Sequence, residues 1–242
     1  MQETSSVYNQ IMAGGEYRTE TRLLSGYKEK SIDSLDIVFS EKELIKIRTK
    51  HGLFLNDALE VGSCVSGEID VEMLYPTEEI PRQAKLVPQV RITNGTLVSE
   101  WLNKGVFFVD TRQKKNSSTG IQRLVIHGYD AMMKTEQDYP ASKLEWPAKD
   151  IDVVREIADH IGVDIDGRTL EIMTRSYAVQ LPYEYTCREV LGYIAAMYGG
   201  CFVMNGSGQL RLIVVSGIPV DTNYLVDENY NAITFGGVRI LV

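Results

Sequence analysis

The sequence predicts an α+β fold that is mainly antiparallel β-sheet. Two observations support this fold class. Short segments of alternating apolar residues fill the first half of the chain, and two segments with helical apolar spacing follow in the second half, at residues 150–161 and 186–198. A β-rich first part therefore gives way to a smaller α+β part.

Residues 17–24, 35–39 and 69–73 alternate apolar and polar side chains, as half-buried strands do. Residues 40–48 fit two interpretations. Ser40 with Glu43 matches a helical capping box, whereas the alternation that follows matches a strand. We expect a short turn that runs into a strand.

Residues 75–88 hold three of the seven prolines, so we expect a loop or an edge excursion there. Asn94-Gly95 is a hairpin turn signal between two short strands. After it the sequence predicts a strand, a polar flexible segment and another strand. The residues concerned are 89–93 and 96–102 for the hairpin, then 105–111, 113–120 and 121–127.

The second half begins with one or two helical turns at residues 129–136. Asp150 is then expected to cap a helix that Gly162 ends. Thr186, with Glu189 three residues later, predicts the capping box of the next helix. A hairpin around residues 205–208 follows that helix.

The chain has 242 residues, with 25 Lys and Arg against 33 Asp and Glu, and a net charge of −8. An acidic balance argues against non-specific binding of a polyphosphate, which requires clustered cations. The three cysteines are far apart and odd in number, so neither a disulfide framework nor a zinc knuckle is expected. No signal peptide and no membrane-spanning apolar run are visible.

No residues point to catalysis, a cofactor or a metal, and the sequence therefore predicts that the chain is not an enzyme. His51, His127 and His160 are scattered and lack a partner at metal-ligand spacing. The stretch 164–167 resembles a calcium loop only in part, and a turn is the better interpretation. Trp101 and Trp146 are isolated, so packing is favoured over a sugar-binding platform.

The order of segments, rather than any single motif, resembles the tail hub proteins of bacteriophages and prophages. These are related to the baseplate hub of contractile tails and to type VI secretion spikes. The matching segments are 59–63, 66–73, 105–111, 126–132, Trp146-Pro147, 186–200 and 233–237.

This resemblance implies a β-barrel tube domain at residues 1–130, a small α+β domain at 131–217, and the start of a further β element at 218–242, where the chain is expected to be cut off. It implies a structural role at the tail hub, which joins the tube to the spike and forms part of the DNA conduit. The implied partners are further copies, as a trimer when full length, and other tail proteins. DNA would pass without being bound specifically, and no cofactor is implied. The protein would be made in the host cytoplasm and reside in the virion tail.

Two alternatives from other classes stay open. The chain could be a segment of a tail-associated cell-wall hydrolase, although no catalytic cluster supports that reading. It could also be a module that binds host-surface carbohydrate, which its 13 tyrosines allow without showing it.

Overall fold

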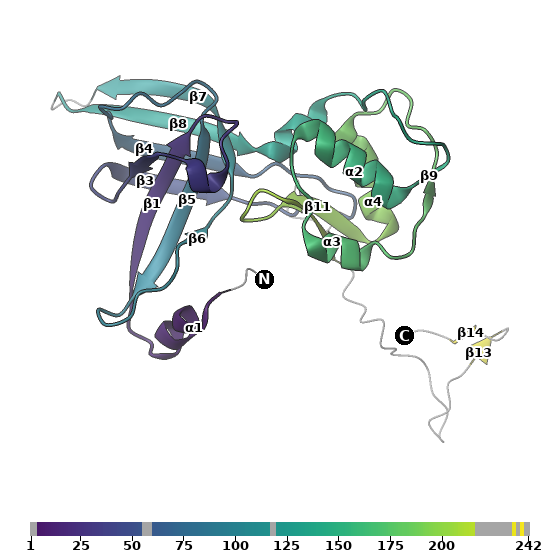
Figure 1. The fold of residues 1–242 in the computed structure, drawn as a ribbon, viewed down its shortest axis with the longest axis horizontal. Helices are drawn as coiled ribbons and strands as arrows, with labels where there is room; N and C mark the ends of the chain where they lie inside the picture. Colours follow the sequence, from purple (N-terminus) through teal and green to yellow (C-terminus); the bar gives the residue numbers. More distant parts are fainter. Residues whose placement is uncertain (1–3, 55–59, 117–119, 216–233, 236–237, 240–242) are drawn as a thin grey trace, which may run out of the picture.

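The computed structural model describes residues 4–54, 60–116, 120–215, 234–235 and 238–239. The molecule is elongated, with a large β-sheet at one end and a smaller α+β unit at the other (Figure 1). Antiparallel pairing throughout the named strands confirms the predicted fold class. Within the described ranges, no helix has the length and apolar character needed to cross a membrane.

The sheet has eight strands in the order β2-β1-β5-β7-β8-β4-β3, and β6 pairs with β5 outside that path. A helix, α1, precedes the sheet, and a short 3-10 helix, η1, precedes β2. The bounds are α1 Ser6–Ala13, β1 Arg18–Gly26, η1 Ile32–Ser34, β2 Ile37–Phe39, β3 Leu44–Lys50, β4 Glu68–Leu74, β5 Lys85–Thr93, β6 Leu102–Asn103, β7 Phe107–Asn116 and β8 Gln122–Asp130.

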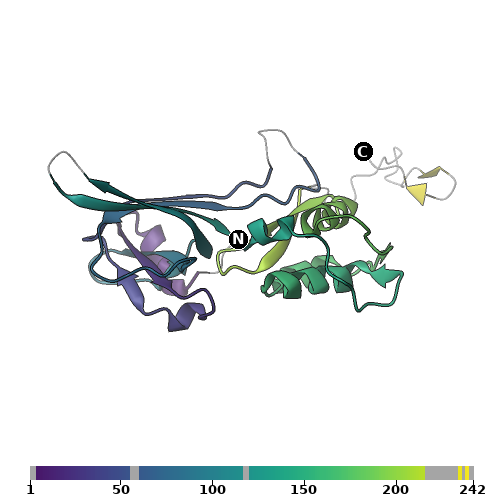
Figure 2. The ribbon, with the colours of Figure 1, turned by 90° about the horizontal axis from the view of Figure 1, so that it is seen from above.

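The sheet folds over itself where β5 meets β7. Only Lys85 and Leu86 of β5 pair with β7, and beyond this corner β1 and β5 cross the direction of β4, β7 and β8 (Figures 1 and 2). Apolar side chains from both halves of the sheet fill the space between them. This core cluster consists of Leu23, Phe39, Ile69, Val71, Met73, Ile80, Ala84, Leu86, Phe107, Val109, Leu124 and Ile126.

The barrel expected from the resemblance is not closed in the described residues. The two terminal strands, β2 and β3, have no pairing with one another. A barrel requires every strand edge to find a partner. β2 contributes only three residues and so leaves little edge for closure. The sheet therefore stays open at both ends.

Pro88 lies inside β5, so the loop expected over residues 75–88 ends earlier than predicted. Its carbonyl oxygen accepts a hydrogen bond of 2.8 Å from the Lys104 amide, on the side of β5 away from β1. Amide and carbonyl of one strand residue face the same side, so the missing N–H costs the β1 ladder nothing. The polar segment predicted to be flexible is also partly strand, because β7 extends to Asn116.

Several local predictions are confirmed. Ser40 and Glu43 form a turn in which the Ser40 amide donates to Glu43 Oε2 at 2.8 Å, and β3 follows directly. Thr93 pairs with Val98 across the Asn94-Gly95 turn. Most of the β element predicted at residues 218–242 lies outside the described residues. Its described part consists of β13 (Thr234–Phe235) and β14 (Val238–Arg239).

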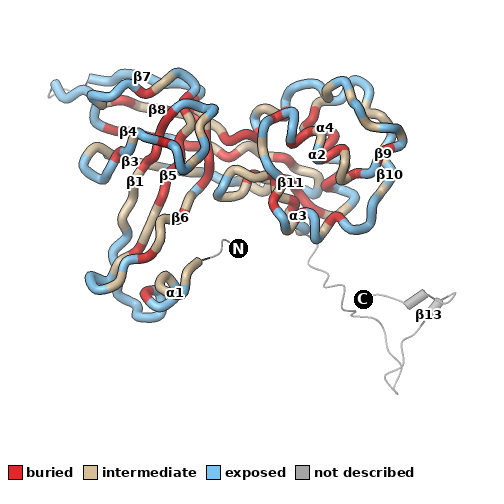
Figure 3. The backbone as a smooth tube through the Cα atoms, viewed as in Figure 1, coloured by how far each residue is buried: buried red, intermediate tan, exposed pale blue. Residues whose placement is uncertain are grey.

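The two main helices and a hairpin of the α+β unit share one apolar core, and Figure 3 shows buried stretches along these elements. Helix α3, which the sequence did not predict, starts from Asp166 as its N-cap, and this explains the Asp-rich stretch. The bounds are η2 Ala131–Glu136, β9 Ala148–Lys149, α2 Asp150–Ile161, α3 Gly167–Ile172, β10 Ala178–Val179, α4 Cys187–Met197, β11 Gly200–Met204 and β12 Leu210–Val214.

Helix caps in this unit follow the sequence with one correction. Thr186 and Glu189 form the predicted capping box, and Gly162 ends α2 with φ of 73°. Asp150, however, is the first helical residue, and Lys149 occupies the cap. The Asp150 carboxylate is fully buried and instead accepts a 2.5 Å hydrogen bond from the Tyr198 hydroxyl.

The two units share residues at their junction. The chain that links β3 to β4 lies against β11, where the Gly62 amide donates to Gly200 at 2.7 Å and the Phe202 amide donates to Ser63 at 3.2 Å. From α4, the Arg188 guanidinium donates to Ser66 Oγ at 2.9 Å. The end of the sheet and the α+β unit are therefore interlocked. The division at residue 130 stays a prediction.

Candidate interaction surface

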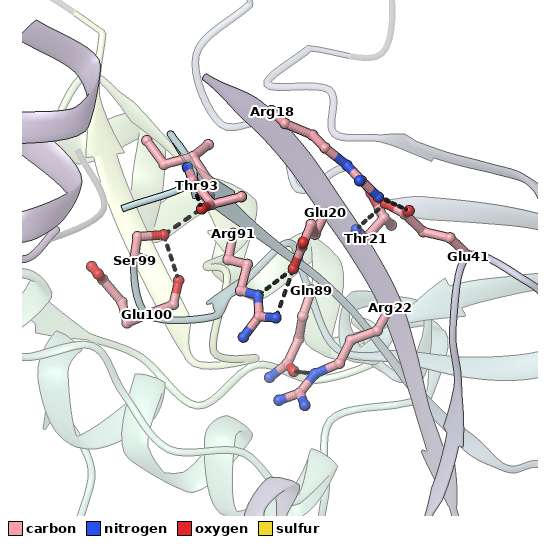
Figure 4. Close-up of polar contacts among 12 residues, drawn as sticks. Arg18, Glu20, Thr21, Arg22, Glu41, Gln89, Arg91, Thr93, Ser99 and Glu100 are labelled. Carbon is pink, nitrogen blue, oxygen red and sulfur yellow. Dashed lines mark hydrogen bonds and ion pairs between the residues drawn. The ribbon is translucent and has the colours of Figure 1, made fainter. Parts of the chain in front are cut away.

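One carboxylate covers the part of the outer β1 edge that does not pair with β2. Beyond its short pairing with β2, the β1 edge exposes backbone groups that could accept another strand. Glu41 occupies this position: its Oε1 accepts from the Thr21 amide at 3.1 Å, and its Oε2 pairs with Arg18 at 3.0 Å (Figure 4). The Glu41 carboxylate thus blocks strand addition at this edge.

A polar ladder joins β1, β5 and β6 on the outer side of the sheet. Arg91 makes a two-pronged contact with Glu20, at 2.7 Å from Nε and 2.6 Å from Nη2 (Figure 4). Arg22 donates to Gln89 at 2.7 Å, and Gln89 donates to Asn103 at 2.7 Å. Each link lies across neighbouring strands, so together they fix the strand register.

Trp101 completes this ladder. The guanidinium carbons of Arg22 and Arg91 lie 4.2 and 4.4 Å from its ring centroid. Burial first, and then the charge of Arg91, lower the pKa of Arg22 from its ordinary value. Two cation–π contacts account for the tryptophan as a packing element, as the sequence favoured. Trp146 packs against Tyr139, with ring centroids 6.3 Å apart.

The N-terminal helix is tied to the same region. The Ser5 amide donates to Glu100 Oε1 at 2.7 Å, and the Ser5 hydroxyl to Oε2 at 2.5 Å. Ser99, next to Glu100 (Figure 4), accepts from the Ile92 amide at 3.0 Å. These bonds hold α1 at the far end of β5.

The opposite end of the sheet is different, because the outer edge of β3 has no partner strand among the described residues. Exposed Lys46 and Arg48 point from this strand, and no carboxylate of the described chain lies within 4.0 Å of either. Lys50 reaches Glu68 only at 3.9 Å. The β3 edge is thus a basic strand that is open to pairing.

A second exposed surface lies on α4 and the segment before it. Tyr183 is 74% exposed, Tyr193 59% and Met197 42%. Tyr185 packs against Tyr193 with ring centroids 5.5 Å apart. We call these four residues the tyrosine face. Exposed aromatic residues of this kind are enriched at protein interfaces.

The histidines lie apart from one another, as their spacing predicted. His127 contacts Asp70 at 2.8 Å on the outer face of the sheet, and His51 contacts the Lys104 carbonyl at 3.0 Å. His160 is exposed in the last turn of α2. Among the described residues, no three His, Cys, Asp or Glu side chains form a metal-binding group.

Asp166 serves the fold rather than an ion. It accepts from the Arg168 amide at 3.0 Å and from the Asn205 amide group at 2.8 Å. The Arg168 side chain, more than any other neighbour, holds the pKa of this carboxyl below its usual range. A helix cap with an ion pair thus explains the stretch that resembles a calcium loop.

One solved structure superposes on most of this open sheet and α+β unit. The 43 kDa tail protein of prophage MuSo2 from Shewanella oneidensis superposes with a TM-score of 0.50 and 15% identity, over 82% of this chain and 56% of that chain. This chain has the fold of a prophage tail protein. The resemblance found in the sequence is therefore confirmed at the level of the fold.

Two further structures are similar to lesser degrees. The tail protein from Neisseria meningitidis MC58 matches with a TM-score of 0.48 and 13% identity, over 89% of this chain and 58% of that chain. A Francisella PdpA–VgrG complex matches at 0.44 and 7%, over 81% and 31%. This chain thus spans less than three fifths of either tail protein. No protein-family model and no curated protein matches the sequence.

Within this tail-protein fold, the sequence did not reveal the surface features. The sequence predicts a turn at Glu41, but the contact of its side chain with Thr21 depends on how the sheet brings β1 close to that turn. The openness of β3 follows from sheet order, which no local pattern encodes. The exposed tyrosines did carry a signal, since Tyr193 and Met197 lie four residues apart on the helix face opposite the apolar stripe.

Proposed function

We propose that the chain is a structural component of a phage or prophage tail, located at the hub where the tube meets the spike. The observation that carries the proposal is the fold shared with a prophage tail protein. The open sheet adds to it, since a subunit with unpaired strand edges is completed by neighbours. The protein is proposed to be made in the host cytoplasm and to reside in the virion tail.

Self-association is proposed to use the basic β3 edge. In the described part of the chain neither Lys46 nor Arg48 makes an ion pair within 4.0 Å, because the carboxylates opposite them, Glu72 and Asp70, pair with Arg123 and His127. The whole chain carries a charge of −8. An acidic neighbour, such as another copy, would supply the missing counter-charges. The full-length assembly is proposed to be a trimer, with residues 1–130 as the tube domain and 131–217 as its α+β companion.

Reversing the charge of the β3 edge tests this proposal. Native mass spectrometry of the full-length protein is expected to show a trimer, and K46E/R48E is expected to shift it to monomer. The matched control, K143E/K149E, makes the same charge change on exposed lysines of the α+β unit and should stay trimeric. A wild-type protein that stays monomeric at high concentration would refute the hub proposal. Equal behaviour of both variants would refute the role of β3.

The proposed conduit lets DNA pass without holding it. A negative lumen repels phosphates, and the net charge of the chain suits that role. Gel-shift measurement with duplex DNA at low salt is expected to show no retardation. Retardation that weakens steeply with added salt would show phosphate binding and overturn this part.

A purely structural role also predicts no turnover of cell-wall substrate. Among the described residues, no three His, Cys, Asp or Glu side chains gather as a metal-dependent hydrolase site would require. A zymogram on peptidoglycan measures this directly. Clearing that persists in purified protein would favour the hydrolase alternative.

A further inference from the structure

A cleft of about 410 Å³ lies where the end of the sheet meets the β11–β12 hairpin. One wall is apolar and includes Val65, Met204 and Ile213. The other carries His51, Lys104 and Asp130. The volume is that of a small-ligand site, and it is large enough for one long side chain.

Asp130 is a buried carboxylate that caps the 3-10 helix η2 and makes no direct ion pair in the described chain. It is 3% exposed, and its oxygens accept from the Gly67 amide at 2.7 Å and the Met132 amide at 3.0 Å. No ammonium or guanidinium of the described chain lies within 4.0 Å of it. Burial raises the pKa of this carboxyl and the charge of the Arg188 guanidinium lowers it, but the hydrogen bonds and ion pair of Arg188 are made with Ser66, Met132, Thr135 and Glu136.

Two amide donors leave part of this carboxylate unsatisfied. An ionised carboxyl group has about four acceptor positions, so about two are unfilled. A buried charge without a partner is unfavourable, and a cation brought to it would be bound strongly. Burial accordingly raises the pKa of Asp130 to about 7.

His51 adds a second acceptor to the same space. Its Nε2 lies 3.0 Å from the Lys104 carbonyl, which can only accept, so Nε2 carries the hydrogen and Nδ1 of the neutral ring is an acceptor. A Cβ placed on Gly67 would lie 2.6 Å from Asp130 Oδ2 and 3.0 Å from His51 Nδ1. Both acceptors therefore lie close against Gly67, which leaves no room for a side chain at that position.

We propose that this cleft binds an alkylammonium or alkylguanidinium group, with the cationic head on Asp130 and His51 and the aliphatic stem against the apolar wall. Such a group is the end of a lysine or arginine side chain, or a free aliphatic amine. Asp130, which the sequence places in the predicted helical turns at residues 129–136, is the specificity-determining residue. The site requires no assembly and can be tested on the chain alone.

Three probes separate charge from shape: N-acetyl-lysine methylamide, the norleucine counterpart that lacks the amine, and n-butylammonium. Binding is followed by NMR through the Gly67 and Met132 amides. The lysine probe is expected to bind at pH 8 at least tenfold more tightly than the norleucine probe. Tighter binding of capped lysine than of n-butylammonium assigns the site to a protein-borne side chain, and the reverse assigns it to a free amine.

Asp130→Ala is expected to abolish binding, whereas Asp138→Ala, at an exposed carboxylate outside the cleft, should leave it unchanged. Should the first variant fail to fold, the pH dependence in the wild type replaces it. Affinity is expected to rise about tenfold from pH 6 to pH 8 as Asp130 ionises. His51 and Lys104 line the same cleft, and the Arg188 charge acts on this carboxyl from outside it.

Three results would overturn the proposal. Equal binding of the lysine and norleucine probes would make the cleft merely apolar. No amide shifts at up to about 100 mM probe would show that no site exists. Affinity independent of pH between 6 and 8 would remove Asp130 from the interaction.

Discussion

Replacing Arg188 by methionine is expected to lower the free energy of unfolding by about 3 kcal/mol. The guanidinium extends from α4 to the end of the sheet, where Nη2 donates to Ser66 Oγ at 2.9 Å and to the Met132 carbonyl at 3.0 Å. Nη1 pairs with Glu136 at 3.1 Å. Nε also donates to Thr135 Oγ1 at 3.3 Å. Methionine keeps the aliphatic stem and removes these bonds together with the charge.

The magnitude follows from the burial of each contact. The arginine side chain is 27% exposed, so its two shorter bonds to neutral oxygens are worth about 1.5 kcal/mol each, the low end for bonds that involve a charge, and the longer bond to Thr135 adds little. Glu136 is 62% exposed, and its ion pair adds less than about 1 kcal/mol. For a chain of this length, the melting temperature should fall by about 6–12 °C.

Urea and thermal unfolding measure this cost, and Arg155→Met is the matched control. Arg155 pairs with Asp152 alone, in a contact that is 53% and 39% exposed, and its loss should cost less than about 0.5 kcal/mol. Arg188→Lys, which keeps the charge without the fork, should fall between the two. If the two methionine variants differ by less than about 0.5 kcal/mol, Arg188 does not join the two units energetically.

Three further predictions concern the same units. Thr186→Ala removes the capping box of α4 and should cost about 1 kcal/mol in urea unfolding; no change would show that the helix end is held by packing alone. Gly192→Ala places a Cβ 2.7 Å from the Gly62 carbonyl oxygen and should lower the free energy of unfolding by about 1–3 kcal/mol. The control, Gly167→Ala, has no neighbour within 4 Å and should be neutral or stabilising. Equal effects of the two variants would contradict the close packing of α4. Burial raises the pKa of Asp130 from 3.8 to about 7, so between these pH values the folded protein holds a proton that the unfolded chain releases. The resulting contribution to stability is full below about pH 4 and is lost as pH rises through 7. Unfolding of Asp130→Asn should therefore depend less on pH between 5 and 8 than that of the wild type, and parallel curves would exclude the carboxyl as the source.

Local sequence signals were sufficient where one segment determines its own structure. Thr186 and Glu189 lie within one helical turn, so the capping box is visible without tertiary information. The apolar spacing from Val153 to Ile161 likewise defines the buried face of α2. Both helices were predicted for this reason.

The sequence was insufficient where the role of a residue depends on a neighbour that is distant in the chain. Pro88 is tolerated in β5 only because the strand on one side changes from β6 to β7 at that point. Asp150 is a residue type that commonly caps helices, but its carboxylate is buried and accepts a hydrogen bond from the Tyr198 hydroxyl. Asp130 belongs to the helical turns predicted at residues 129–136, but nothing local shows that the distant Gly67 amide also donates to its carboxylate. No local pattern contains these partners.

The unequal edges of the sheet restrict how copies of this chain can associate. Strand pairing at the β2 end is limited to three residues, because Glu41 covers the adjoining stretch of β1. The β3 edge offers seven residues, but two such edges meeting face to face would form a two-fold dimer and bring Lys46 and Arg48 of both copies together. A three-fold ring therefore needs a contact beyond strand pairing. The tyrosine face is the exposed surface suited to supply it, and Tyr193→Ser should weaken the ring as K46E/R48E does.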